Sequence, residues 1–117
     1  MRFLVLMAEE DHFARWDAAD EAERHAVFEC FQAFDAAVKE RGTIVAGEAL
    51  ASPAEARTLG PGPTRAVTDG PYAETVEQTG GFYLVDLPSH EAALEAAALL
   101  PPAYTVEVRP VLDVVFD

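Results

Sequence analysis

Hydrophobic residues cluster in four short segments that are typical of β-strands. Phe3 to Met7 and Phe82 to Leu87 are apolar at both alternating sets of positions, the pattern of strands covered on both faces. Thr43 to Leu50 is predicted to be a strand with Ile44, Ala46, Glu48 and Leu50 on one side. Tyr104 to Val111 is predicted to be the last strand, with Glu107, Arg109 and Val111 on one face. Pro110 fits an edge or the end of the last strand, because proline cannot donate a ladder hydrogen bond. The pattern therefore predicts a four-stranded sheet.

Two further segments carry apolar residues at helical spacing. The longer one begins at Asp20, whose side chain can cap a helix together with Glu23, and it ends before Gly42. The shorter one begins at Ser89 and ends at the proline pair 101–102. The apolar stripe of the longer helix consists of Val27, Phe31, Phe34 and Val38. Each helix is expected to bury its stripe against the sheet.

Residues 9–20 are predicted to form a loop that carries Phe13 and Trp16. These two aromatic side chains can form a lid over a cleft or anchor an interface, or they can plug the end of the core, and we favour the plug. Residues 51–66 are rich in proline and glycine, and Arg57 to Leu59 is expected to pair with Thr64 to Val67 as a short hairpin.

The order of the elements is βαβ, a hairpin insertion, and βαβ again. This order predicts a single α+β domain over residues 1–117, with a ferredoxin-like split βαβ fold and both helices on one face of an antiparallel sheet. Because the strands are apolar on both faces, a monomer would expose the second face to water. We therefore expect a homodimer in which two sheets pack face to face.

Charge and cysteine content narrow the possible partners and location. Eight basic and 21 acidic residues give a net charge of −13, which argues against nucleic acid or an anionic membrane as a partner. Solubility is the favoured interpretation of this charge, and a surface for a cation or a cationic partner is the alternative. Cys30 is the single cysteine and is expected to be a buried, inert thiol in a reducing compartment. With no convincing signal peptide and no apolar run long enough to span a membrane, the expected location is the cytoplasm.

Polar residues that ordinary packing does not require are densest between Val67 and Tyr83. The stretch opens with the turn Asp69-Gly70-Pro71 and leads through several polar residues to Gly80-Gly81. Loops on a rigid scaffold often carry function. The candidate general bases are Asp69, Glu74 and Glu48, the last a lone carboxylate on an apolar strand that needs a partner. The candidate ligand-binding residues are Tyr72, Thr75, Glu77, Tyr83 and Arg109.

Each of these candidates also has a structural interpretation. Asp69 can cap its own turn, Glu74 and Glu77 can be solvated, and Arg109 can neutralise a carboxylate. The spacing of the acidic residues matches no known cation loop, so no metal site and no cofactor are predicted. The three histidines, at positions 12, 25 and 90, are interpreted as surface residues rather than ligands.

The quoted motifs resemble the DGPF branch of the YCII-related family. The resemblance rests on Thr68-Asp69-Gly70-Pro71-Tyr72, Glu74-Thr75, Glu77, Gly80-Gly81-Phe82-Tyr83 and Val106 to Val111. It departs from the family at Tyr72, which replaces a phenylalanine, and at Val76, where the family often has a lysine. The resemblance implies a ferredoxin-like fold that dimerises into an α+β barrel, no established activity, and a functional link to a sigma-70-like factor.

The wider family includes proteins similar to muconolactone isomerase that use a histidine and an aspartate. By position those residues would be Phe31 and Glu40 here, so that chemistry does not carry over. Two functions are open. The first is a small-molecule-binding or regulatory protein of the DGPF type, and the second is an enzyme that uses carboxylate acid–base chemistry on a small organic acid or lactone.

Overall fold

The computed structural model describes residues 1–72 and 77–114 of the chain. Its sheet and helices follow one another in the predicted order, with an additional short helix after the first strand. The elements are β1 Arg2–Glu10, α1 His12–Ala18, α2 Glu21–Arg41, β2 Thr43–Ala49, the 3₁₀ turn η1 Pro53–Glu55, β3 Arg57–Leu59, β4 Val67–Asp69, β5 Glu77–Asp86, α3 His90–Ala97 and β6 Thr105–Pro110.

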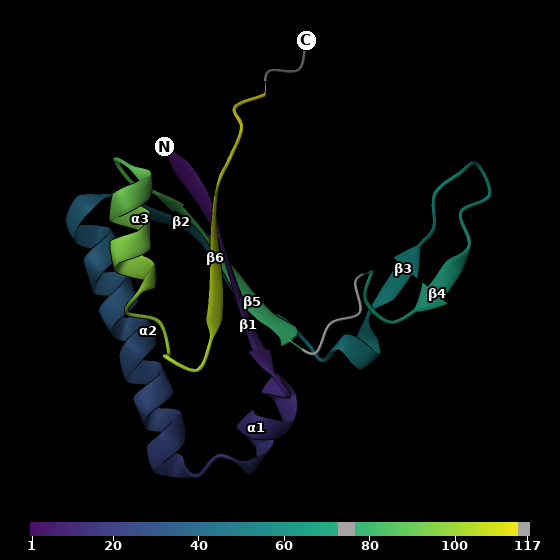
Figure 1. Ribbon diagram of the computed structural model, residues 1–117, viewed down its shortest axis with the longest axis horizontal. Helices are drawn as coiled ribbons and strands as arrows, with labels where there is room; N and C mark the ends of the chain where they lie inside the picture. The colour runs from purple at the N-terminus through teal and green to yellow at the C-terminus, as the bar shows by residue number, and fades with distance from the viewer. Residues whose placement is uncertain (73–76, 115–117) are drawn as a thin grey trace.

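The main sheet has the strand order β2-β5-β1-β6, and every neighbouring pair is antiparallel. Helices α2 and α3 lie on one side of this sheet, and β3 and β4 form a separate ribbon on the other side (Figure 1). The expectation of an α+β fold with an antiparallel sheet is thus confirmed. No closed barrel is present in the part of the chain that the structure describes.

The core lies between the main sheet and helices α2 and α3. Phe3 and Val5 of β1, Phe34 and Val38 of α2, and Val85 of β5 are completely inaccessible to solvent. Burying an aliphatic or aromatic side chain of this size contributes roughly 1.5–3 kcal/mol, so these contacts fix the helices on the sheet. Small alanine side chains of α3 allow that helix to approach closely.

The long helix begins and ends where the sequence predicts. The Glu23 amide donates to Asp20 at 2.8 Å and the Asp20 amide donates to the Glu23 carboxylate at 3.5 Å, which completes the capping box. The helix ends at Gly42, where a Cβ would lie 1.9 Å from the Asp86 carbonyl oxygen. Glycine is required at this position because the two backbones approach each other closely. Ser89 caps α3 by accepting from the Ala92 amide at 3.1 Å.

Three local predictions were wrong in detail. Residues 12–18 form a helix rather than a loop, since Asp11 takes a left-handed conformation (φ 53°) and its carbonyl accepts from the Arg15 amide at 2.8 Å. The hairpin forms, but β3 pairs with residues 67–69 rather than 64–67. A register irregularity in β2 places Ile44 opposite buried Val85, so Ile44 does not share a face with Glu48 as alternation predicted.

The sheet has a second face, which we call the open face, and no helix of the described residues covers it (Figure 1). Leu4 and Leu6 of β1 lie on it, and cross-strand pairing adds Leu84 and Phe82 of β5. These four side chains are partly exposed. On β6 the same pairing places Arg109 opposite Leu4 and Glu107 opposite Leu6. The open face is therefore an apolar strip bordered by charged residues.

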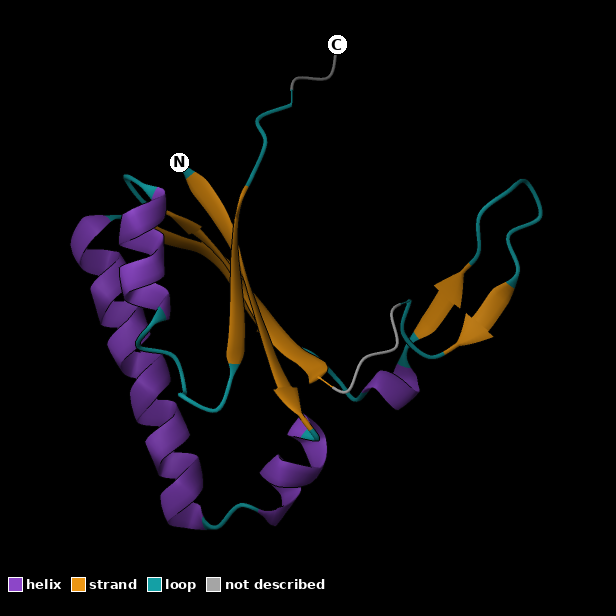
Figure 2. Ribbon diagram, in the orientation of Figure 1, coloured by secondary structure: helices purple, strands orange, loops and turns teal. Residues whose placement is uncertain are grey.

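Residues 51–72 form an extension that we call the arm. It contains η1, β3 and β4 and stands away from the main sheet (Figure 2). No residue of the arm is buried. Local hydrogen bonds hold its ribbon closed at Gly70, whose amide donates to the Ala56 carbonyl and whose carbonyl accepts from the Thr58 hydroxyl, both at 2.7 Å.

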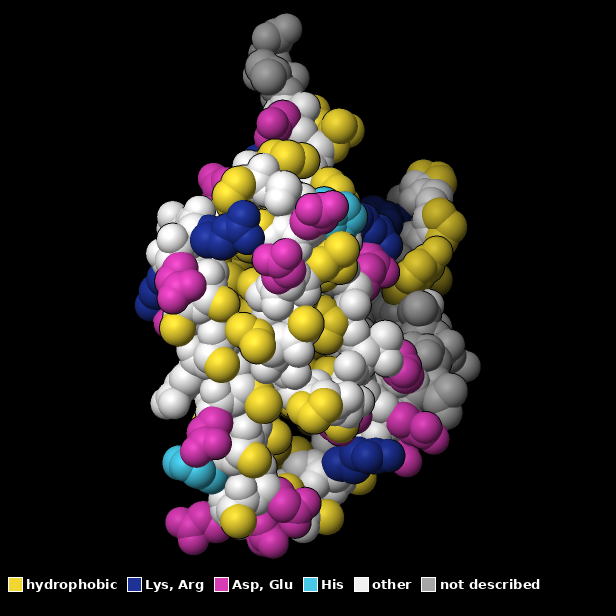
Figure 3. Space-filling view, turned by 60° about the vertical axis from the view of Figure 1, so that its left-hand side comes forward, with side chains coloured by type: hydrophobic (Ala, Val, Ile, Leu, Met, Phe, Trp, Pro, Cys, Tyr) yellow, Lys and Arg dark blue, Asp and Glu magenta, His cyan; other side chains and the backbone are white. Residues whose placement is uncertain are grey.

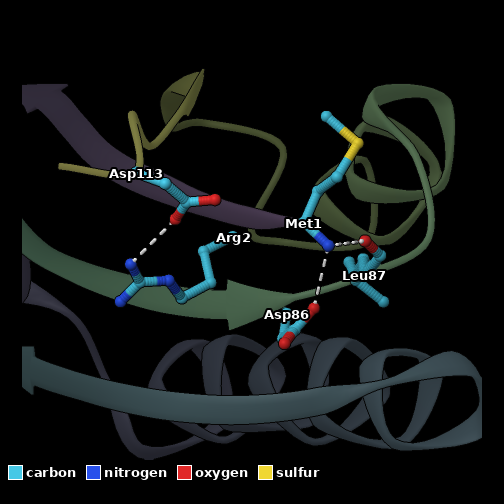
Figure 4. A network of polar contacts seen from close by, with 5 residues as sticks. All are labelled: Met1, Arg2, Asp86, Leu87 and Asp113. Atoms are coloured by element: carbon cyan, nitrogen blue, oxygen red, sulfur yellow. Dashed lines mark hydrogen bonds and ion pairs between the residues drawn. The ribbon is translucent and has the colours of Figure 1, made fainter. Parts of the chain in front are cut away.

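Polar contacts also secure the end of the sheet opposite α1 (Figure 4). The Met1 ammonium donates to the Asp86 carboxylate and to the Leu87 carbonyl, each at 3.0 Å. Arg2 donates to Asp113 at 3.3 Å and so ties the segment after β6 to the start of β1. These contacts lie far along β1 from its turn into α1.

Acidic side chains are spread over the face on which the helices lie, with few basic ones among them (Figure 3). Within residues 1–72 and 77–114, no helix combines the length and the hydrophobicity required to cross a membrane.

Candidate functional site

A cleft of about 560 Å³ opens at the end of the sheet where β1 passes into α1. Helices α1 and α2 contribute to it, together with β2 and β5. Its lining residues are Met7, Ala8, His12, Phe13, Trp16, Val27, Phe28, Phe31, Gly47, Glu48, Ala49, Leu50, Gly80, Gly81, Phe82, Tyr83 and Tyr104. A hollow of this size, with mostly apolar walls and few polar groups, is typical of sites that bind small molecules.

Aromatic side chains of α1 and α2 form one wall of the cleft. The rings of Trp16 and Phe28 meet edge to face with their centroids 5.6 Å apart. Arg24 of α2 holds α1 in place, because it lies 5.0 Å over the Trp16 ring and donates to the Trp16 carbonyl at 2.8 Å. Phe13 and Trp16 thus line a cleft rather than belonging to the buried core.

Glycines of β2 and β5 form the opposite wall. Between β1 and β5 the pairing shifts from Met7–Gly81 to Ala8–Thr79, which leaves Gly80 as an extra, unpaired residue of a β-bulge. A Cβ at Gly80 would lie 2.4 Å from the His12 ring, and one at Gly47 would lie 2.6 Å from the Tyr83 ring. The two glycines therefore allow the His12 and Tyr83 rings to pack directly against the strand backbone.

His12 and Glu9 are the most closely associated polar pair at the cleft. The His12 Nδ1 atom lies 2.9 Å from the Glu9 carboxylate, and the side chains are only 15% and 11% exposed. The Tyr104 ring meets the His12 ring edge to face with centroids 5.5 Å apart. The carboxylate and the tyrosine together fix the orientation of the imidazole.

Two tyrosines belong to the lining. Burial, together with nearby Glu9 and Cys30, raises the pKa of Tyr104 to about 12. Burial and the charge of Asp35 also raise the pKa of Tyr83. Both phenols consequently stay protonated near neutral pH and can donate a hydrogen bond to a bound molecule.

The structure brings only two of the predicted site residues to the cleft. Tyr83 lines it from β5, and Glu48 lines it from the edge strand β2, where its register partner is Phe82. Glu77 lies outside the lining, at the start of β5, where its carboxylate accepts from the Thr105 hydroxyl at 2.7 Å.

The remaining candidates lie elsewhere or outside the described part. Asp69 is in the arm, 91% exposed, with its carboxylate 3.6 Å from Arg57, and Tyr72 is 93% exposed. Arg109 pairs with Glu107 at 2.6 Å on β6. Glu74 and Thr75 lie outside the described residues. Asp69 and Arg109 therefore do not lie at this cleft with Tyr83 and Glu48.

Sequence reasoning missed His12 and Glu9, which were treated as a surface histidine and the polar end of a strand. The available signal was the run Glu9-Glu10-Asp11-His12 directly after a buried strand, a common location for functional residues. Cys30 is half-buried rather than buried, and it lines a second hollow of about 510 Å³ together with Glu9, Arg15 and Tyr104. Among the described residues, no group of three or more histidine, cysteine, aspartate or glutamate side chains is arranged to hold a metal ion.

Comparison with known proteins places the chain in a family. Over 48 residues it is 50% identical to a protein of Rhizobium meliloti (strain 1021) that is itself described as uncharacterised. That alignment covers 38% of this chain and 39% of the relative, so the match spans well under half of either protein. The family model of the YCII-related domain, by contrast, matches residues 1–115. Since this match covers nearly the whole length, the chain belongs to the YCII-related domain family.

Proposed function

We propose that the protein binds a small, planar and largely apolar molecule in the cleft between α1, α2 and the sheet. The observation that carries this proposal is the facing of an aromatic wall by a glycine wall across about 560 Å³. Aromatic faces favour flat apolar ligands. Volumes of roughly 300–1,000 Å³ are usual for such sites.

The alternative, an enzyme that uses several carboxylates, receives less support from the geometry. Carboxylates raise one another's pKa only when they lie close together. Asp69 is in the arm and Glu77 lies at the strand start beside Thr105, so neither faces Glu48 across the cleft lining. The link to a sigma-70-like factor, the assignment to the DGPF branch and the cytoplasmic location stay predictions.

The binding proposal can be tested with 4-nitroanisole, a flat molecule without an acidic proton, followed by protein NMR. Trp16 is the single tryptophan of the chain and lines the cleft, so its indole N–H signal reports on the site. We expect this signal and those of Gly80 and Gly81 to shift on titration.

A pair of variants separates the cleft from the rest of β2. Ala49→Trp fills the cleft from an exposed position of the edge strand, and binding should be lost. Val45→Trp adds the same side chain at a half-exposed position of the same strand outside the lining, and binding should persist. Equal shifts in both variants, or shifts confined to the arm, would contradict the proposal.

We further propose that a second copy of the chain covers the open face, giving the ferredoxin-like dimeric α+β barrel that the family resemblance implies. Three observations support this assembly. Helices α2 and α3 both lie on one side of the main sheet. On its other side, Leu4, Leu6, Phe82 and Leu84 stay uncovered. Glu107 and Arg109 border this strip, and opposite charges on one surface can complement themselves across a twofold axis. The arm projects on the same side and offers a further surface to a partner (Figure 1).

Sedimentation velocity tests the assembly. The wild-type protein should sediment as a dimer, and Leu6→Arg should sediment as a monomer because it places a charge in the centre of the apolar strip. Leu94→Arg, at a position that is half-exposed on α3, is the matched control and should leave the dimer intact. A monomeric wild-type protein would exclude the barrel.

A further inference from the structure

We infer that the ligand of the cleft is a weak acid, a phenol or an enol, and that His12 accepts its proton. This inference rests on the binding function proposed above and adds the chemical class of the ligand. The O–H bond of the ligand breaks, its electron pair stays on the ligand oxygen, and the proton forms a new N–H bond at Nε2 of His12. The bound state is then a ligand anion beside an imidazolium that the Glu9 carboxylate stabilises.

The tautomer of His12 follows from its partner. An ionised carboxylate can only accept hydrogen bonds, so at 2.9 Å from Glu9 the Nδ1 atom carries the proton. In the neutral imidazole the other nitrogen, Nε2, is then an acceptor. Adding a proton to Nε2 leaves the bond to Glu9 in place and turns it into a charge-assisted one.

The position of Nε2 is set by the bulge in β5. A Cβ at Gly80 would lie 2.4 Å from Nε2, so the imidazole packs directly against the β5 backbone where the strand lacks a side chain. Both residues belong to the cleft lining. No hydrogen bond joins Nε2 to another group in the described part of the chain. No described side-chain nitrogen or oxygen is both fully buried and without a hydrogen bond, so Nε2 keeps some exposed surface and is available to a molecule in the cleft.

The charges around the cleft select a weak acid over a permanent anion. The described lining contains no lysine and no arginine, and Glu9 next to His12 already supplies a negative charge. A carboxylate or phosphate ligand would enter with its charge unpaired, at a high desolvation cost. A phenol or enol enters neutral, and its anion forms only together with the imidazolium that pairs with it.

Other titratable groups near His12 favour the same outcome. Glu9 comes from β1, Tyr104 precedes β6, and Asp11 and Arg15 belong to the segment of His12 itself, while Glu48 is the acidic residue that lines the cleft from β2. Tyr104 and Tyr83 keep their protons and can donate to the ligand oxygen once it is anionic. Both tyrosines line the same cleft as His12.

The probe for this inference is 4-nitrophenol, whose anion is yellow and whose neutral form is not, compared with 4-nitroanisole, which has nearly the same shape but no acidic proton. Below the pKa of the free phenol, wild-type protein should bind 4-nitrophenol at least about 10-fold more tightly than 4-nitroanisole, the factor typical of a hydrogen bond to a charged group. The bound phenol should show the absorption band of the anion.

Variants assign the proton to His12. His12→Gln should lose the anion band and about 10-fold in affinity for 4-nitrophenol, and an NMR spectrum as well dispersed as that of the wild type shows that the variant is folded. Glu9→Gln should weaken the band because the imidazolium loses its partner. His90→Gln is the control, since His90 is exposed and stacks on Phe3 away from the cleft.

The outcomes distinguish the two proposals. If 4-nitroanisole binds in the cleft but 4-nitrophenol binds no more tightly and shows no anion band, proton transfer is overturned and the binding function stands. If His12→Gln keeps the band, the role of His12 is overturned. If neither probe binds to the wild-type protein, the binding function and the inference that rests on it are both overturned.

Discussion

The main sheet with its helices, which we call the body, and the arm differ in how much hydrophobic surface they bury. The body buries twelve hydrophobic side chains between a sheet and two helices, whereas residues 51–72 bury none. In the arm, Leu59 and Val67 lie opposite each other at the end of the ribbon and stay 54% and 50% exposed. The radius of gyration is 16.2 Å, compared with about 13 Å for a compact domain of this length.

This difference indicates which part of the chain is stable by itself. The body gains its stability from tertiary packing, the usual source for helices and sheets. A two-stranded ribbon without a packed face is marginal in water. The arm must therefore depend on its own hydrogen bonds or on the surface of another molecule, in agreement with the proposed dimer.

The largest effect is expected in the body. Phe34→Ala should reduce the free energy of unfolding by about 3–5 kcal/mol, because it leaves a cavity at a fully buried position. Leu59→Ala in the arm should change it by no more than about 0.5 kcal/mol in the monomer. Urea unfolding of both variants in the Leu6→Arg background measures this contrast, and similar losses would mean that the arm is packed after all.

Helix caps provide a second matched pair. Asp20→Ala removes the cap of α2 and should cost about 1 kcal/mol. Ser52→Ala removes the hydrogen bond from the Ala54 amide at the start of η1, and it should cost less than half as much because few residues depend on it. Chemical denaturation gives both values. A larger loss for Ser52→Ala would show that the arm contributes to global stability.

A smaller effect is expected at alkaline pH. The pKa of Tyr104 is about 12 in the folded protein and about 10 in an unfolded chain, so the folded state retains its proton over this interval. The corresponding stability is present below pH 10 and is lost as the pH rises toward 12. Because Tyr104 is only half-buried, the effect is modest.

Tyr104→Phe should make the unfolding free energy less dependent on pH between 10 and 12. Tyr72→Phe, at a 93% exposed position at the end of the arm, should leave the pH dependence unchanged. Urea titrations at a series of alkaline pH values compare the two variants, and identical curves would contradict the raised pKa of Tyr104.

The smallest effect is expected for the ion pair of the arm. Arg57 and Asp69 are well exposed, and such pairs contribute about 0–1 kcal/mol. Asp69→Ala should change stability by less than about 0.5 kcal/mol and should leave 4-nitroanisole binding unaffected. Loss of binding in this variant would return Asp69 to the site and would indicate that the arm reaches the cleft of a partner.

Local signals predicted most of the body. The capping box at Asp20, the apolar stripe of α2 and the apolar strands at Phe3 and Phe82 depend on interactions within a few residues or on burial alone. The order of these elements then limits the topology to a few arrangements. The register break in β2 and the position of β4 were not predicted correctly. Both depend on cross-strand pairing, which the spacing of apolar residues along the chain does not reveal.

The sequence did not predict the lining of the cleft, and the reason is physical. The density of polar residues pointed to the stretch 67–83, but the structure places residues 67–72 in the arm and residues 77–83 in β5. The cleft instead combines residues from distant parts of the chain, such as His12, Phe31 and Gly80. Their aromatic and glycine types look like ordinary core and turn residues, so only the fold reveals that they share a cavity.

The turn at Asp11 sets the tilt of the wall that carries Phe13 and Trp16. Asp11 is the single non-glycine residue with a positive φ in the described part of the chain. A left-handed conformation costs an ordinary residue roughly 1–2 kcal/mol, and glycine avoids this cost. Because Asp11 lies outside the cleft lining, Asp11→Gly would relieve this cost without altering any side chain that touches a bound molecule.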